Sequence, residues 1–225
     1  MPDLDFSIED AAAPPFCAAP TLLFKLRLQN REPEPVRSVM LKVQVKMQAD
    51  ARSYDERDRE RLSELFGLPE QWSKSLKSLL WTETVVLVPA FKQDIVVDVP
   101  LTCTYDLDVL NAKYLYAVRA GNIPLEFLFS GTMFYQGRVG LQAAQIPWEK
   151  ETHYSLPARL WHEMMDHFFP NSAWLRLQKD AYDALFAYKA RHSLPTWEAT
   201  LQQLLAQAQP APAPPPRVEQ EADLT

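Results

Sequence analysis

The stretch that decides the fold reads TLLFKLRLQN and spans residues 21–30. Apolar side chains occupy every second position and alternate with lysine, arginine and glutamine. Strict alternation over this length is typical of a β-strand with one buried face. Residues 39–48 repeat the pattern, and the sequence EPEP at residues 32–35 predicts a turn between the two strands. The two segments therefore predict an antiparallel hairpin.

Further strand patterns follow along the chain. Residues 81–88 and 94–103 are apolar and rich in β-branched side chains, which predicts a second hairpin. Residues 123–135 are apolar on both faces, as expected of a central strand, and turn into residues 138–146. About six strands in three hairpins predict an α+β, β-rich fold. We expect an antiparallel, immunoglobulin-like β-sandwich with helical insertions.

Two helical insertions are candidates. Residues 55–66 predict a charged helix, and Ser53 and Glu56 have the spacing of a capping box. Residues 107–120 leave two alternatives open. Their apolar spacing and a cap at Asp106 favour a helix, whereas alternating tyrosines would also fit a strand.

The C-terminal third predicts a segment of three helices at residues 148–206, packed on the sandwich. The first helix begins near Pro157 with Ser155 as its cap, the second at Asn171 or the next residue, and the third after Thr196. The apolar stripe of the first helix consists of Leu160, Trp161, Met164, Met165 and Phe168. The residues expected to point inward from the second are Trp174, Leu177, Ala181, Leu185 and Tyr188.

The ends differ in composition from the middle. Residues 1–20 predict a flexible lead, residues 21–147 form the predicted sandwich, and residues 207–225 predict a disordered acidic tail rich in proline and alanine. A chain of 225 residues with 47% hydrophobic residues can bury a sizeable core.

Charge and composition exclude several partner classes. Lys and Arg number 23 against 29 Asp and Glu, which gives a net charge of -6 and no basic cluster suited to nucleic acid. We find no signal peptide and no apolar run long enough to span a bilayer, so we expect a cytoplasmic protein without membrane insertion. The two cysteines, Cys17 and Cys103, lie far apart and predict reduced thiols.

The hypothesis of a metal-binding site depends on the segment HEMMDH at residues 162–167. Its residues His162, Asp166 and His167 have side chains that coordinate metals, yet the histidines are five apart, about 140° around a helix. They therefore fail the i,i+4 spacing of zinc peptidases and are better read as a solvated helix face. Because no catalytic constellation is evident, we predict no cofactor, and only groups assembled by folding would make this chain an enzyme.

The connector at residues 168–174 concentrates aromatic side chains between two predicted helices. Phe169, Asn171 and Trp174 are candidate contacts with a partner protein. The alternative, which we favour, is that the aromatic pair staples the helices onto the sandwich.

Several short segments of the chain carry a family resemblance. They are AAPTLLF (18–24), CTYD (103–106), IPL (123–125), FSGT (129–132), FPNS (169–172), WLRL (174–177) and LPTWE (194–198). With these segments the chain resembles an uncharacterised bacterial family, a domain of unknown function, from about residue 17 to residue 206. Genes of that family lie beside nickel-iron hydrogenase and maturation genes, so the resemblance implies a hydrogenase-associated context.

These observations lead to one function hypothesis and two alternatives. We expect a non-enzymatic cytoplasmic accessory or assembly factor that binds another protein, with a hydrogenase component as a candidate partner. The first alternative is a nickel- or zinc-handling protein that uses residues 162–167. The second is a small enzyme whose site forms only on folding.

Overall fold

The computed structural model describes residues 1–103, 109–172, 175 and 177–208. The chain divides into two compact units, Met1–Ala173 and Trp174–Thr225. The strands are β1 (Leu4–Ala12), β2 (Thr21–Asn30), β3 (Val36–Met47), β4 (Leu79–Val88), β5 (Asp94–Thr102), β6 (Asn122–Gly137), β7 (Gly140–Gln145) and β8 (Glu151–Pro157). The helices are α1 (Glu56–Phe66), α2 (Trp72–Ser75), α3 (Val109–Ala117), α4 (Ala158–Phe168), α5 (Lys179–Arg191) and α6 (Trp197–Ala208), with 3-10 helices η1 (Ala49–Ala51) and η2 (Pro69–Gln71).

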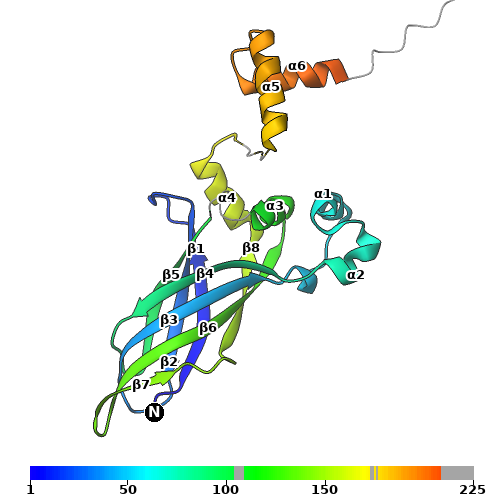
Figure 1. The fold of residues 1–225 in the computed structure, drawn as a ribbon. Helices are drawn as coiled ribbons and strands as arrows, with labels where there is room; N and C mark the ends of the chain where they lie inside the picture. Colours follow the sequence, from blue (N-terminus) through cyan, green and yellow to red (C-terminus); the bar gives the residue numbers. More distant parts are fainter. Residues whose placement is uncertain (104–108, 173–174, 176, 209–225) are drawn as a thin grey trace, which may run out of the picture. The chain divides into compact units, whose positions relative to one another are not determined.

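The strands form two antiparallel sheets that share one hydrophobic core (Figure 1). Sheet A has the order β1-β2-β5, and sheet B has the order β4-β3-β6-β7, with β8 also paired to β6. The predicted mixture of strands and helices, rich in antiparallel strands, is therefore confirmed. The alternating apolar positions of β2 and β3 point into the core and are fully buried.

Aromatic side chains from both sheets meet in this core. The ring of Phe6 on β1 stacks on Phe129 of β6 at a centroid distance of 4.4 Å. Phe24 on β2 makes an edge contact with Phe127 of β6 at 5.2 Å. Because each such side chain contributes about 1.5–3 kcal/mol on burial, these contacts hold the two sheets together.

Two of the three predicted hairpins are wrong. β2 and β3 follow one another in the chain but belong to different sheets, and β4 and β5 are divided in the same way. The connections between them cross the core from one sheet to the other. A strand alternates in the same way whether such a connection or a hairpin follows it, so alternation does not distinguish the two. The third hairpin, β6 with β7, is confirmed by pairing from Thr132 with Gln145 to Gly137 with Gly140.

The estimate of six strands missed β1 and β8. Residues 1–20 are not a flexible lead throughout, because Leu4–Ala12 pairs along β2. Its apolar residues alternate with acidic ones, and those acidic residues form ion pairs rather than indicating disorder. Ser155 does not cap a helix but lies within β8, which pairs with the first half of β6. α4 then begins directly at Ala158.

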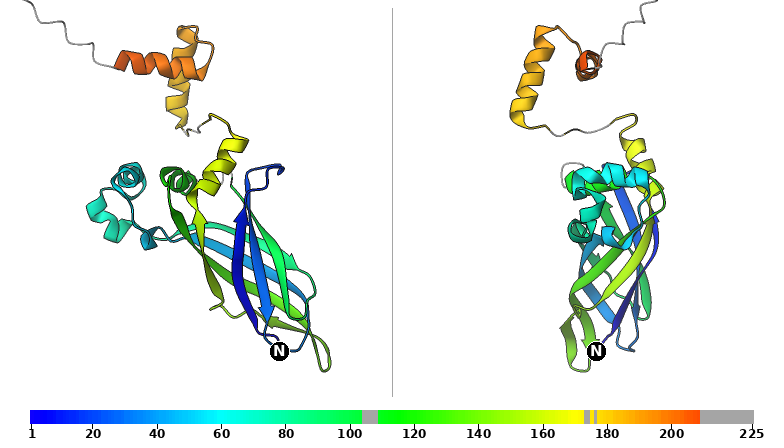
Figure 2. Two further views of the ribbon diagram at one scale, coloured as in Figure 1. Left: turned by 180° about the vertical axis from the view of Figure 1, so that it is seen from behind. Right: turned by 90° about the vertical axis from the view of Figure 1, so that its right-hand side faces the viewer.

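Helices α1, α3 and α4 gather at one end of the two sheets, opposite the N-terminus (Figure 2). The N-cap of α1 is Asp55 rather than Ser53, because the Asp55 side chain accepts a hydrogen bond from the Asp58 amide at 2.7 Å. Of the two alternatives for residues 107–120, the structure shows the helix, over Val109–Ala117, and not the strand. The predicted cap at Asp106 lies outside the described residues.

The apolar stripe of α4 is confirmed, since Trp161, Met164 and Met165 are buried and its two other members pack against the core. By contrast, the predicted three-helix segment is divided, with α4 in the first unit and α5 and α6 in the second.

The second helix of that segment begins seven or eight residues later than predicted, at Lys179, and it contains no buried residue. The cap of α6 is confirmed, because Thr196 Oγ1 accepts a hydrogen bond from the Ala199 amide at 3.1 Å. None of the described helices combines the length and apolarity needed to cross a membrane. The predicted tail at 207–225 lies outside the described residues from residue 209 onward.

Candidate functional site

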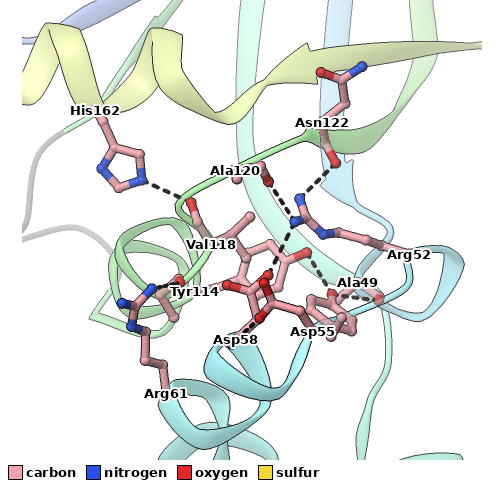
Figure 3. A network of polar contacts seen from close by, with 12 residues as sticks. Ala49, Arg52, Asp55, Asp58, Arg61, Tyr114, Val118, Ala120, Asn122 and His162 are labelled. Atoms are coloured by element: carbon pink, nitrogen blue, oxygen red, sulfur yellow. Dashed lines mark hydrogen bonds and ion pairs between the residues drawn. The ribbon is translucent and has the colours of Figure 1, made fainter.

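A polar network occupies the helical end of the first unit (Figure 3). Its centre is the Arg52 guanidinium, which follows η1 and is almost fully buried. The guanidinium donates hydrogen bonds to the backbone oxygens of Asn122 at 2.8 Å and Ala120 at 2.6 Å, and to Asp58 Oδ2 at 3.3 Å. One side chain therefore joins the start of α1 to the connection between α3 and β6.

The C-terminal end of α3 is capped by side chains from two other helices. Arg61 of α1 donates to the Ala117 oxygen at 3.5 Å, and the His162 Nε2 of α4 lies 2.9 Å from the Val118 oxygen. These side chains satisfy carbonyls that a helix end leaves without intrahelical partners, and Arg52 binds the carbonyls that follow. The arrangement orients α1, α3 and α4 relative to one another.

A pair of tyrosines lies beneath this network. The Tyr54 hydroxyl donates to the Ala49 oxygen at 2.7 Å and lies 2.8 Å from the Tyr114 hydroxyl. Burial raises the pKa of both phenols above their ordinary value, so both remain protonated at neutral pH. The network holds the helices through the Arg52–Asp58 ion pair, neutral phenols and backbone carbonyls, and this arrangement indicates a structural role.

The structure does not assemble the predicted metal ligands. His162 is directed at Val118, as above, whereas His167 Nε2 lies 3.2 Å from the Pro15 oxygen, and Asp166 is exposed. Among the described residues, these three side chains do not form a group whose ligand atoms converge.

A different trio does converge on the outer face of sheet B. Glu126 of β6 pairs directly with His153 of β8, and Glu151 lies two residues before His153 on the same face. Their ligand atoms all lie within 4.8 Å of one another. The Lys46 amine lies 3.5 Å from Glu126, so it neutralises part of the negative charge. Sequence reasoning missed the trio because its members come from two strands, one of which was not predicted.

The three candidate partner contacts in the connector at residues 168–174 differ in their placement. Phe169 is half-buried and packs against the core, as expected of a staple within the chain. Asn171 is exposed and adopts a positive φ of 51°, which ends the α4 segment in a turn. Trp174 lies outside the described residues.

The second unit carries a surface that was not predicted, which we call the aromatic face. In α5, Tyr182 and Phe186 lie one turn apart, and their rings are 6.4 Å apart. Trp197, at the start of α6, contacts both rings, at 5.4 Å from Tyr182 and 6.4 Å from Phe186. Leu201 and Leu205 follow Trp197 at successive turns of α6 and extend the same stripe.

The aromatic face is open to solvent. Phe186 is 54% exposed and Leu205 is 65% exposed, and Tyr182 and Leu201 are also exposed. The side chains predicted to point inward from α5 occupy other positions, and its Leu185 is only half-buried. The i,i+4 spacing of residues 182 and 186 was the available sequence signal for this face.

One end of the aromatic face has a cationic rim. The Lys189 amine lies over the Trp197 ring, 5.8 Å from its centroid, and Arg191 follows in the last turn of α5. Neither cation forms an ion pair with a carboxylate among the described residues, whereas Lys179 at the other end of α5 pairs with Asp183 at 2.9 Å. The rim therefore offers positive charge to a ligand.

Comparison with known proteins gives one family match. The model of the family described as Family of unknown function (DUF6084) matches residues 1–213. No curated protein matches the chain.

Solved structures with limited likeness include three proteins. A protein described as a late embryogenesis abundant (LEA) protein has 11% identity and a TM-score of 0.30 over 70% of this chain and 73% of its own. A β-glucosidase from Kluyveromyces marxianus has 12% identity and a TM-score of 0.27 over 68% of this chain and 15% of its own. A protein described as ApaA from Bordetella pertussis has 12% identity and a TM-score of 0.26 over 69% of this chain and 95% of its own. At these TM-scores the likenesses carry no argument about this chain.

Proposed function

The chain belongs to the DUF6084 family, and we propose that it is a non-enzymatic accessory or assembly factor that binds another protein. The aromatic face of α5 and α6 is the docking surface in this proposal. The observation that carries it is the exposure of four large apolar side chains on one side of a two-helix pair, Tyr182, Phe186, Leu201 and Leu205, around the partly buried ring of Trp197.

The energetics of the helix pair support this assignment. Thr200 is the single buried residue that the structure describes in α5 and α6. Isolated helices of this length are marginal in water, and their stability in proteins comes mostly from packing of an apolar face. A partner that covers the aromatic face supplies that packing, and exposed apolar patches of this kind mark interaction sites.

The charges around the face define the partner's chemistry. A complementary surface is an apolar groove or helix with carboxylates at the end that meets Lys189 and Arg191. We propose a hydrogenase component as the partner, on the basis of the gene context implied by the family resemblance, and we place the complex in the cytoplasm. Within this proposal the two sheets provide an immunoglobulin-like scaffold.

The test is affinity purification of the full chain from its native host, compared across three forms. Wild type is expected to recover a hydrogenase component that is lost with the double variant Phe186→Ser/Leu205→Ser. The matched control Gln202→Ala, an exposed polar change on α6, is expected to keep it. Recovery of the bait alone, or equal recovery of the component by all three forms, would overturn the proposal.

A metal-handling role is a second candidate, favoured by the convergence of Glu126, Glu151 and His153. Two carboxylates and one imidazole form a ligand set that divalent transition metals accept. Isothermal titration with Ni²⁺ or Zn²⁺ should show binding by wild type that His153→Ala abolishes. The control pair His162→Ala/His167→Ala should bind as wild type does, and loss of binding in that pair alone would exclude this site.

A further inference from the structure

Most sheet edges in the described structure are protected against pairing with another strand. The β5 edge of sheet A contains Pro100, which lacks an N–H donor, and its Asp94 and Asp98 form ion pairs with side chains of β2. The β1 edge has a bulge between Ile8 and Asp10. On the other side of sheet B, β7 is only six residues long. These features are the usual means by which proteins prevent edge-to-edge association.

The β8 strand is also covered, because it lies beside β1. The Tyr154 ring of β8 makes an edge contact with Phe24 of β2, the strand next to β1, at a centroid distance of 5.8 Å. Lys150, just before β8, forms an ion pair with Asp3 at 2.8 Å and another with Asp5 at 3.6 Å. The two sheets therefore meet along this side of the core.

The β4 edge of sheet B has a pairing irregularity at Trp81, and after that residue the described structure shows none of these protections (Figure 1). β4 is ten residues long with the sequence LLWTETVVLV, and it contains no proline, no glycine and a single charged residue, Glu83. That charge already forms an ion pair with Lys42 of β3 at 2.8 Å. Val85 and Leu87 are 63% and 72% exposed on the outer face, and Met40 beside Leu87 is exposed as well.

Among the described residues, a side chain of α3 occupies the first part of this edge. The buried Asn111 amide of α3 donates to the backbone oxygens of Leu80 at 2.8 Å and Trp81 at 3.3 Å. The side chain therefore takes the place of a neighbouring strand at these two residues. In the described part of the chain, residues 82–88 form a nearly neutral edge with the single charge of Glu83, and long edges of low charge are the type of strand that accepts another.

We propose that residues 82–88 of β4 pair antiparallel with the same residues of a second copy of this chain, continuing sheet B across a twofold axis. An antiparallel strand edge is self-complementary, and a twofold dimer is the commonest closed assembly. Charge favours the second copy as the occupant, since Glu83 is held by its own Lys42 and each edge presents neutral apolar side chains to the other.

The occupied and free parts of β4 define the register. The midpoint of residues 82–88 is Val85, so Val85 faces its own copy across the axis and Glu83 faces Leu87 of the second copy. In this register no like charges lie directly opposite each other. Pairing centred on Glu83 would instead place the two Glu83 side chains opposite each other.

Cysteine cross-linking of the full chain tests this register. At the axis, the two Val85 Cα atoms would lie about 4.5–5.5 Å apart, within the range that a disulfide spans. We expect Val85→Cys, in a Cys17→Ser background, to form a covalent dimer under mild oxidation. The matched control is Leu87→Cys, equally exposed on the same strand, whose two copies would lie about 13 Å apart and stay monomeric. Cross-linking of both variants alike, or of neither, would contradict the pairing.

Analytical ultracentrifugation supplies the second measurement. Wild type is expected to show a concentration-dependent dimer, and Val85→Lys should weaken it by about tenfold or more, because two lysines would then face each other. Circular dichroism should be unchanged, since Val85 is exposed. A wild type that is monomeric at every concentration, or a dimer that tolerates Val85→Lys, would overturn the proposal. Dimer loss in the Phe186→Ser/Leu205→Ser variant with Val85→Lys unaffected would assign the contact to the aromatic face instead.

Discussion

Replacing Arg52 with methionine is the most direct test of the polar network. The methionine keeps the apolar stem but removes the guanidinium from Asp58, and the two side chains are 11% and 8% exposed. It also removes the donors to the backbone oxygens of Asn122 and Ala120. Breaking a buried ion pair at one partner costs about 3–5 kcal/mol, because the other charge stays buried. Since the guanidinium still reaches solvent, we expect about 3 kcal/mol.

The sign of the pH dependence follows from Asp58. Burial and the neighbouring Asp55 raise the pKa of Asp58, and Arg52 opposes that shift. Without Arg52 the pKa of Asp58 should rise further, so the carboxyl takes up a proton at higher pH and loses its buried charge. The destabilisation caused by Arg52→Met is therefore expected to be smaller in mildly acid buffer than at neutral pH.

Urea denaturation followed by circular dichroism measures these free energies of unfolding. The control is the same Arg52 change in an Asp58→Asn background, where no buried charge is left unpaired and the cost should fall to about 1–2 kcal/mol. Equal costs in the two backgrounds, or a cost below about 1 kcal/mol in wild type, would refute the role assigned to the ion pair.

Three further changes test other parts of the structure. Gly131 has a φ of 131°, and a Cβ there would overlap a backbone oxygen of β3, so Gly131→Ala should cost more than about 3 kcal/mol in urea denaturation, against about 1 kcal/mol for Gly140→Ala, which has open space. Burial raises the pKa of the Cys103 thiol to about 12, so a thiol reagent should modify Cys17 in the folded protein and the second cysteine only after unfolding. Burial lowers the pKa of His162 below 6.5, so the free energy of unfolding should decrease as pH falls below about 6.5, and His162→Gln should flatten that dependence.

Sequence reasoning predicted elements better than their partners. The strands β2 and β3 follow directly from alternation, because their apolar positions must point into one core. Which strand each one pairs with depends on whether the connecting residues reverse the chain within a sheet or cross to the other sheet, and both connections preserve the alternation. β1 was missed because residues 1–20 were assigned to a flexible lead from their composition. In the structure Asp5 and Glu9 form ion pairs with arginines of the turn after β2 and of β2.

For the candidate surfaces too, the sequence shows local spacing but not the contacts between distant residues. Tyr182 and Phe186 have a spacing that is visible in the sequence, but only the fold shows that Trp197 joins them and that the face is exposed. Arg52 carries no local signal, since its partners come from α1 and from the connection after α3. Residues that act through contacts distant in sequence cannot be recognised from spacing alone.

The contrast between the polar network and the exposed surfaces bears on where this protein interacts. At the helical end, Arg52, Arg61 and His162 each bind a carbonyl at the end of α3 or in the connection after it, so new partners there would have to replace contacts within the chain. The exposed side chains of the aromatic face and of the β4 edge can gain contacts with a partner without breaking hydrogen bonds of the polar network. Association should therefore favour these two surfaces, and substitutions in the polar network should change stability before they change partner binding.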